Sequence, residues 1–166
     1  MPTISKDLKE RLSKIDQIRQ ELSKAEQSAV KDIMDMLKEL MVNNPKLEAI
    51  RWQQWIPGFN DGEPCEFTVG EISFQFANAV EKDENGEEQD SEDFMDEYDL
   101  KKYFERQVDI LNHKEVTALK KSVDEATAVF GKLTEMESQL RDMFGDNMEI
   151  TVTASGVETE EYDCGY

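Results

Sequence analysis

The sequence predicts an α+β protein: a long antiparallel helical hairpin of coiled-coil type that carries a small antiparallel β-sheet head of three to four strands. Three observations support this fold class. Two segments, 4–44 and 116–143, repeat apolar residues every three or four positions, as amphipathic helices do. Between them, residues 46–80 alternate apolar and polar side chains, as half-buried strands do. The length of 166 residues fits a single domain, 1–166.

The first helix is expected over residues 4–44, where no glycine or proline interrupts the apolar stripe. Thr3 or Ser5 is a suitable N-cap, and Asn44 ends the helix because a residue before proline is pushed out of helical geometry. The stripe is expected to bury itself against residues 116–143 of the same chain. A dimer in which both stripes pack against a partner subunit would satisfy the same pattern.

The segment 46–80 is expected to form a β-hairpin head. Apolar residues alternate from Ile50 to Ile56, and Asp61-Gly62 is typical of a tight turn. Beyond the turn, Cys65, Phe67 and Val69 alternate, which predicts that Cys65 faces the core. The alternation then shifts by one residue after Gly70, which indicates a β-bulge or a bend. The two tryptophans, Trp52 and Trp55, are expected on opposite faces of the first strand.

The remaining elements follow from shorter patterns. We expect an acidic loop over 81–99, helices within 100–144, a strand over 147–154 and an acidic tail over 156–166. A short helix over about 97–111 is expected either to continue into the next helix or to meet it at a kink near Asn112-His113. Asn112 and Glu115 match a capping pair, and Gly145 stands where a left-handed C-cap belongs.

The formal net charge is −19, and it is unevenly distributed. Residues 1–51 sum to +1, residues 52–99 to −14, residues 100–145 to zero and residues 146–166 to −6. Such a negative field repels phosphate backbones and anionic lipid surfaces, so direct binding to nucleic acid or to a membrane is disfavoured. The natural partner of such a surface is a basic protein.

The stretch 52–67, WQQWIPGFNDGEPCEF, is the densest in unusual residues, but it lacks the pattern of an active site. A cysteine nucleophile needs a base, and the single histidine, His113, lies about fifty residues away. The acidic neighbours Glu63 and Glu66 disfavour the thiolate form that a reactive Cys65 would need. The stretch is therefore interpreted as a hairpin with a structured turn. We expect no catalytic residue, no metal and no cofactor.

The motif R-W-x-Q-W-x-P-x-F-N-D-G-x-P-C-x-F-x-V, which begins at Arg51, resembles one found in uncharacterised proteins of bacteriophages and bacteria. The resemblance covers about 20 of 166 residues. It implies a phage or bacterial origin, and it implies no activity and no site residue.

Residues 81–99 contain eleven acidic side chains and one lysine. One interpretation is a solvated hairpin that turns at Asn85-Gly86. A second is a calcium loop with EF-hand spacing from Glu81 to Glu92. Two residues argue against it: the first position is a glutamate instead of an aspartate, and Glu88 stands where an apolar residue should pack. A third is a surface for a basic partner. The residues expected to contact that partner are Glu81, Asp83, Glu84, Glu87, Glu88, Asp90, Glu92 and Asp93.

The third interpretation has a physical basis, because duplex DNA carries one negative charge per about 1.7 Å of its axis. Acids from 81–99, from 61–71 and from the tail would together imitate that field. We therefore hypothesise a non-catalytic acidic protein-binding protein of phage origin, a DNA-mimic inhibitor that occupies the basic surface of a host nucleic-acid-binding protein. The alternative is a coiled-coil adaptor or scaffold, as a homodimer. A metal-dependent enzyme is a third class, for which the sequence offers only loose acids.

The expected compartment is the cytoplasm, which is the host cytoplasm for a phage protein. There is no apolar run near 18 residues, and the N-terminal MPTISKDLKE lacks the features of a secretory signal. Cys65 and Cys164 are expected to be reduced thiols.

Overall fold

The computed structural model confirms the α+β class. It describes residues 5–58, 62, 65–77, 79–82, 85, 88–91, 94–110 and 112–163, with 79–82, 88–91 and 106–110 described by their backbone. In chain order the elements are α1 (Lys6–Asn43), β1 (Leu47–Trp55), β2 (Thr68–Val69), β3 (Ser73–Phe76), β4 (Ala79–Lys82), β5 (Glu88–Ser91), α2 (Glu97–Ile110), α3 (His113–Thr134), α4 (Glu137–Phe144), β6 (Met148–Thr153) and β7 (Gly156–Glu161).

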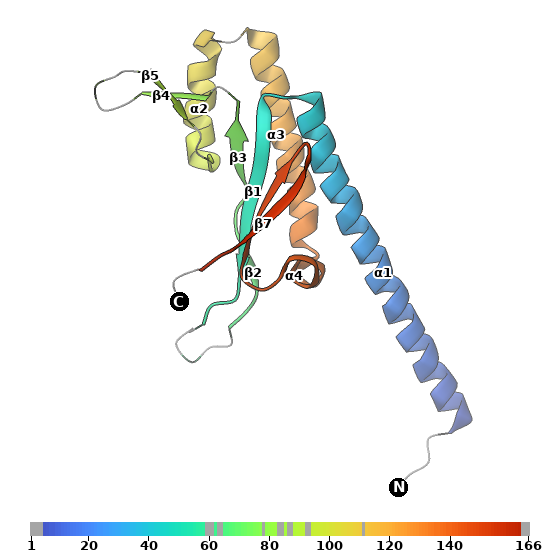
Figure 1. The fold of residues 1–166 in the computed structure, drawn as a ribbon. Coiled ribbons are helices and arrows are strands. Elements are labelled where there is room, and N and C mark those ends of the chain that lie inside the picture. Colours follow the sequence, from blue (N-terminus) through green and yellow to red (C-terminus); the bar gives the residue numbers. More distant parts are fainter. Residues whose placement is uncertain are drawn as a thin grey trace.

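Helix α1 begins and ends where its local signals predict. The Ser5 hydroxyl oxygen accepts a hydrogen bond from the backbone N–H of Leu8 (3.2 Å), which caps the first turn. At the other end, Asn44 leaves helical geometry before Pro45, and its N–H donates to the carbonyl of Leu40 (3.0 Å). The 38 residues make a helix of roughly 57 Å. The N-terminal half of α1 extends beyond every other described element (Figure 1).

Five strands form one antiparallel sheet. Its order is β2–β1–β6–β7, and β3 also pairs with β1. The register sets Trp52 of β1 opposite Ile150 of β6 and Ile50 opposite both Val152 and Phe74. Strands β4 and β5 form a separate antiparallel pair. The predicted strand 147–154 is confirmed as β6.

The predicted irregularity at Gly70 is confirmed, because β2 stops at Val69 and β3 starts only at Ser73. The Gly70 N–H donates to the carbonyl of Gln53 (2.7 Å), so the backbone lies close to β1 at this point. A Cβ atom on residue 70 would lie 2.9 Å from Cζ3 of Trp55. A larger residue would therefore displace the Trp55 indole.

The core lies between one face of the sheet and the helices that cover it. Trp52 is at its centre, with its ring 5.3 Å from that of Phe130 and 6.1 Å from that of Phe144. Near α2, the ring of Phe76 stacks on Tyr103 at 4.4 Å. Only the C-terminal half of α1 takes part, through Val30, Ile33, Met34, Leu37 and Met41.

The stripe over 116–143 is carried by two helices instead of one. The chain leaves helical geometry at Met136, between α3 and α4. Helix α3 runs in the opposite direction to α1 (Figure 1), and Asn44 Nδ2 donates to Ser122 Oγ at 3.5 Å. Helix α4 reaches α1 at Glu26, whose Oε2 accepts from Gln139 Nε2 (3.3 Å). Together, α3 and α4 are too short to cover α1 over its full length.

Two acidic segments contain more regular structure than the sequence indicated. Residues 156–161, expected as part of an acidic tail, form strand β7, and Val157 pairs with Val152 of β6. The expected acidic loop 81–99 includes the end of β4, all of β5 and the start of α2. The N-cap predicted at Asn112 is confirmed, because Asn112 Oδ1 accepts from the N–H of Glu115 (2.8 Å). Gly145 ends α4 with a positive φ of +104°, but its ψ of 173° is extended, so the predicted left-handed C-cap is not formed.

Candidate functional site

The stretch around the two tryptophans has a structural role. Trp52 is buried, and its indole N–H donates to Oε1 of Gln54 (3.3 Å). Nε2 of Gln54 donates in turn to the carbonyls of Leu140 (3.0 Å) and Gly145 (2.8 Å), at the C-terminal end of α4. This buried amide therefore ties β1 to α4. As predicted, Trp55 lies on the other face, where its ring is 5.9 Å from that of Tyr162.

The prediction that Cys65 faces the core is wrong. Cys65 is exposed and free, because β2 begins only at Thr68 and the alternation that included Cys65 is not that of a strand. His113 is exposed at the start of α3. Within the part of the chain that the structure describes, no three His, Cys, Asp or Glu side chains lie close enough together to hold a metal ion.

The polar face of the sheet carries a hydrogen-bond network. Nε of Arg51 lies 3.0 Å from Thr151 Oγ1 and 3.3 Å from Glu149 Oε1, and the other Glu149 oxygen accepts from Gln53 Nε2 (2.8 Å). The Arg51 guanidinium also lies 3.7 Å from the ring centre of Phe94. These contacts link strands β1 and β6 and engage both oxygens of Glu149.

The eight acidic residues predicted to contact a partner are only partly placed by the structure. Glu81 pairs with Gln89 in the β4–β5 ladder, Glu88 pairs with Lys82, and Asp90 pairs with Val80. The remaining five lie outside the described residues: Asp83, Glu84, Glu87, Glu92 and Asp93. Most positions of the proposed calcium loop lie outside them as well. The β4–β5 ladder agrees with the hairpin interpretation of this segment.

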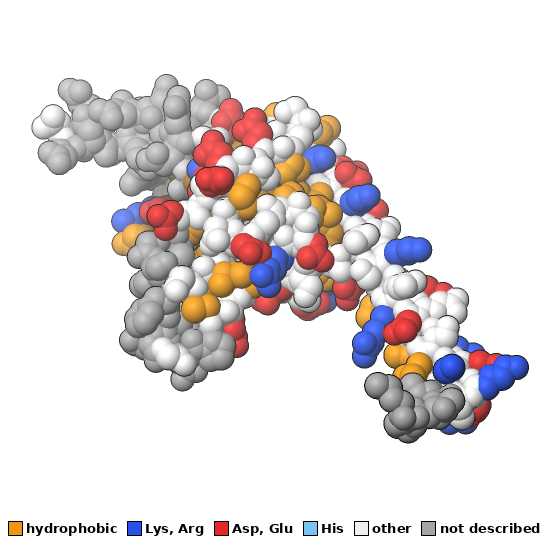
Figure 2. Space-filling view, turned by 60° about the horizontal axis from the view of Figure 1, so that its bottom comes forward, with side chains coloured by type: hydrophobic (Ala, Val, Ile, Leu, Met, Phe, Trp, Pro, Cys, Tyr) orange, Lys and Arg blue, Asp and Glu red, His pale blue; other side chains and the backbone are white. Residues whose placement is uncertain are grey.

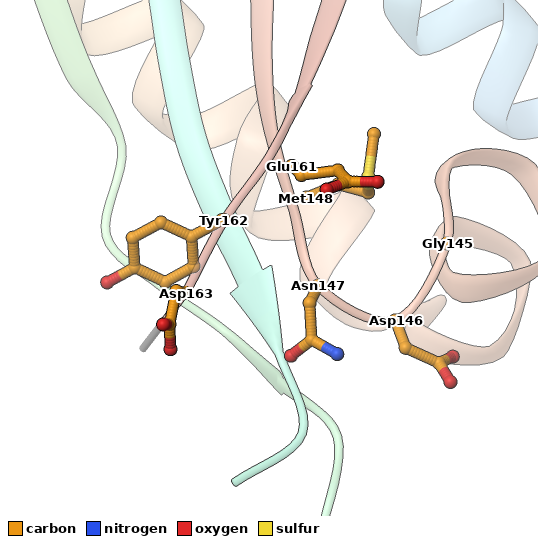
Figure 3. A pocket seen from close by; sticks show the side chains of 7 residues that line it. All are labelled: Gly145, Asp146, Asn147, Met148, Glu161, Tyr162 and Asp163. Carbon is orange, nitrogen blue, oxygen red and sulfur yellow. The ribbon is translucent and has the colours of Figure 1, made fainter. Parts of the chain in front are cut away.

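A shallow hollow of about 800 Å³ lies where α4, β6 and β7 meet (Figure 3). Asp146, Glu161 and Asp163 contribute carboxylates to its lining. Asp146 is held by the Arg141 guanidinium at 2.6 Å, and this contact raises the pKa of Arg141. Asn147 is also engaged, because its Oδ1 accepts from the N–H of Ile56 (3.2 Å). Asp146 and Asn147 therefore serve to join neighbouring elements at this hollow.

A second hollow of about 790 Å³ runs between α2, α3 and strands β2 and β3. Apolar and aromatic side chains line its floor, and Glu71, Glu97, Lys101, Lys120 and Asp124 are among its polar lining. The acids and bases are mixed, so the charges select no sign of ligand. Gly70 and Gly131, which have no side chain, also line the hollow.

The most distinctive surface is an apolar stripe on the projecting half of α1, formed by Leu8, Leu12, Ile15, Ile18 and Leu22. These five side chains are 45–63% exposed, and they make up five of the nine large apolar residues exposed among the described residues. Hydrophobic side chains are visible along the projecting helix in Figure 2. Scattered exposed leucines are ordinary, whereas a contiguous apolar surface marks an interaction site. We call these five residues the α1 stripe.

Sequence reasoning found the residues of the α1 stripe but expected them to be buried against residues 116–143, whereas they are exposed. Their spacing predicted a helix with one apolar face, which is confirmed over Lys6–Asn43. The spacing carried no information on how far α3 and α4 would reach along that face.

Comparison of the chain with protein-family models, with curated proteins and with solved structures finds no match. Among the described helices, none is both long enough and apolar enough to cross a membrane.

Proposed function

We propose that the protein is a non-catalytic coiled-coil scaffold that assembles with a second copy of itself through the α1 stripe. The observation that carries the proposal is the exposure of five large apolar side chains on one face of a projecting helix. The four steps from Leu8 to Leu22 span 14 residues, an average of 3.5 residues per step. This is the average period of apolar residues in a coiled-coil seam.

The projecting half of α1 gains little stability from its own chain. Every residue from Ser5 to Leu22 is exposed, and Val30 is the first fully buried residue of the helix. Most of the stability of a helix in a protein comes from tertiary packing of its amphipathic face. Because each stripe residue is about half exposed, burying it against a partner contributes about 1 kcal/mol.

A second copy is a suitable partner for electrostatic reasons. Residues 1–51 sum to +1, whereas residues 52–99 and 146–166 sum to −14 and −6, so contact through either of those regions would bring strongly acidic segments together. The projecting helix belongs to a part of the chain without this excess of negative charge.

Sedimentation equilibrium tests this function directly. The wild-type protein is expected to have twice its chain mass of 19.2 kDa, and Ile18→Glu is expected to sediment as a monomer because it places a charge in the seam. Val42→Glu is the matched control, since Val42 is 61% exposed on the same helix and Ile18 is 63% exposed. Helical content from circular dichroism verifies that each variant is folded. A monomeric wild type at high protein concentration would refute the proposal.

An inhibitor of the DNA-mimic type is the second candidate, and β7 favours it. Glu158, Glu160 and Glu161 are exposed on this strand, so part of the predicted acidic surface belongs to the ordered sheet. The expected partner is the basic surface of a nucleic-acid-binding protein. Capture of such a protein from bacterial lysate at low salt, with release at high salt, is the expected result. Retention of no basic protein at low salt would count against this function.

A further inference from the structure

We infer that two copies of α1 pair in antiparallel orientation, with a two-fold axis at Ile15; this inference rests on the proposed scaffold function. The α1 stripe is symmetric about Ile15, because its steps are four, three, three and four residues. A two-fold axis at Ile15 sets residue i level with residue 30 − i of the partner. Leu8 then faces Leu22, and Leu12 faces Ile18. An isologous contact requires this kind of self-complementary surface.

The free length of the helix agrees with the same axis. The helix cap is at Ser5, and the first hydrogen bond from α4 to α1 is at Glu26. The free segment is therefore 5–25, and its midpoint is Ile15. In the antiparallel pair, the cap of one helix lies level with Ala25 of the other, one residue before α4 reaches the helix. The two free segments thus overlap fully, and neither helix runs into the body of the other copy.

The charges along the helix favour this orientation. Residues 6–14 carry four basic and two acidic side chains, and residues 16–24 carry two of each. The antiparallel axis sets each positive segment against a neutral one. A parallel pair would instead place the two positive segments side by side, where like charges destabilise the contact.

The acidic bodies give the larger electrostatic effect. In a parallel pair both bodies, each with a net charge of −20 over residues 52–166, would lie at the same end of the coiled coil. In the antiparallel pair they lie at opposite ends, with the two Val30 positions about 45 Å apart along the axis. That separation is several times the Debye length of about 8 Å at physiological ionic strength, so repulsion between the bodies is screened.

Thiol cross-linking tests the orientation. In a background of Cys65→Ser and Cys164→Ser, single variants Leu8→Cys, Ile15→Cys and Leu22→Cys are treated with a short bis-maleimide. Ile15→Cys is expected to cross-link to itself, because position 15 faces position 15 of the partner. Leu8→Cys and Leu22→Cys are expected to remain uncross-linked alone and to cross-link when mixed, since each lies about 21 Å along the axis from its own counterpart.

The outcomes separate this inference from the proposed function. Sedimentation of the same variants establishes whether they form dimers. A dimer in which Leu8→Cys and Leu22→Cys each cross-link alone is parallel, and it overturns the inference while leaving the scaffold function in place. A dimer in which none of the three positions cross-links overturns the inference as well, because its interface lies elsewhere. A monomer refutes both proposals. Val42→Cys, outside the stripe, is the control and is expected to give no cross-link.

Discussion

The two halves of α1 have the same kind of sequence and opposite environments. Val30 and Leu37 are fully buried, whereas Ile18 and Leu22 are 63% and 58% exposed on the same continuous helix. The C-terminal half is covered by α3, α4 and the sheet, and the N-terminal half extends past all of them. An amphipathic period therefore predicts an apolar face on a helix, and it does not show how much of that face the rest of the chain covers.

The largest expected difference between the halves is in the cost of losing a leucine side chain. Leu37→Ala removes a side chain with no exposed surface, so it is expected to lower the free energy of unfolding by about 2–5 kcal/mol. Leu12→Ala is expected to change it by less than about 0.5 kcal/mol in dilute monomer. Urea denaturation at low protein concentration measures both values. Equal losses at the two positions would mean that the N-terminal half is also packed within the chain.

The boundary between the halves is set by α4, and Gln54 holds α4 in place. Gln54→Leu leaves the carbonyls of Leu140 and Gly145 without their buried donor, which is expected to cost about 1–3 kcal/mol. Amide hydrogen exchange near Val30 is expected to accelerate, because α4 covers that part of α1 less firmly. Gln53→Leu, on the polar face of the sheet, is the control. Unchanged exchange near Val30 in Gln54→Leu would show that α4 does not set the boundary.

Alkaline pH is expected to weaken only the packed body. Burial raises the pKa of Tyr103 to about 12, because the phenolate would lose its hydration. Below pH 10 the hydroxyl is protonated in both the folded and the unfolded chain. Between pH 10 and 12 the unfolded chain releases this proton first, so folding stability falls as pH rises, by about 1.4 kcal/mol per pH unit. Denaturation curves for Tyr103→Phe are expected to lack this contribution, and an identical pH slope in the variant would exclude it.

The smallest expected effect strengthens the body without touching the α1 stripe. Gly131 lies inside α3, and a Cβ atom there would meet nothing within 4 Å. Gly131→Ala is therefore expected to raise the free energy of unfolding by about 0.5–1 kcal/mol through helix propensity alone. Sedimentation of this variant is expected to match the wild type. A loss of stability would indicate that the added methyl group clashes with neighbouring atoms.

Local features of the fold were predictable because they depend on a few neighbouring residues. The caps at Ser5 and Asn112, the positive φ at Gly145 and the break at Gly70 each follow from residue type and immediate spacing. Features that depend on distant contacts were not predictable in this way. Residues 156–161 are rich in glutamate and have weak β-propensity, yet they pair with β6 along their full length.

The same distinction between local and distant contacts applies to the candidate sites. The residues of the α1 stripe were predictable from their period, but their exposure follows from the lengths of α3 and α4, which end the cover at Glu26. The outward position of Cys65 depends on where β2 starts, and alternation over three residues was too short to fix that start. The predicted contact residues in 81–93 stay a prediction, because most of them lie outside the described residues.

The continuity of α1 also has a mechanical consequence. One helix without a glycine or proline runs from Lys6 to Asn43, so its free end and its packed end are parts of one stiff lever. A load applied near Leu8 is carried along the backbone to Met41 and to the strand that follows at Leu47. A force on the projecting half of α1 therefore acts on β1, which lies inside the sheet. The packed side chains around Val30 and Leu37 resist the bending of the helix against the body.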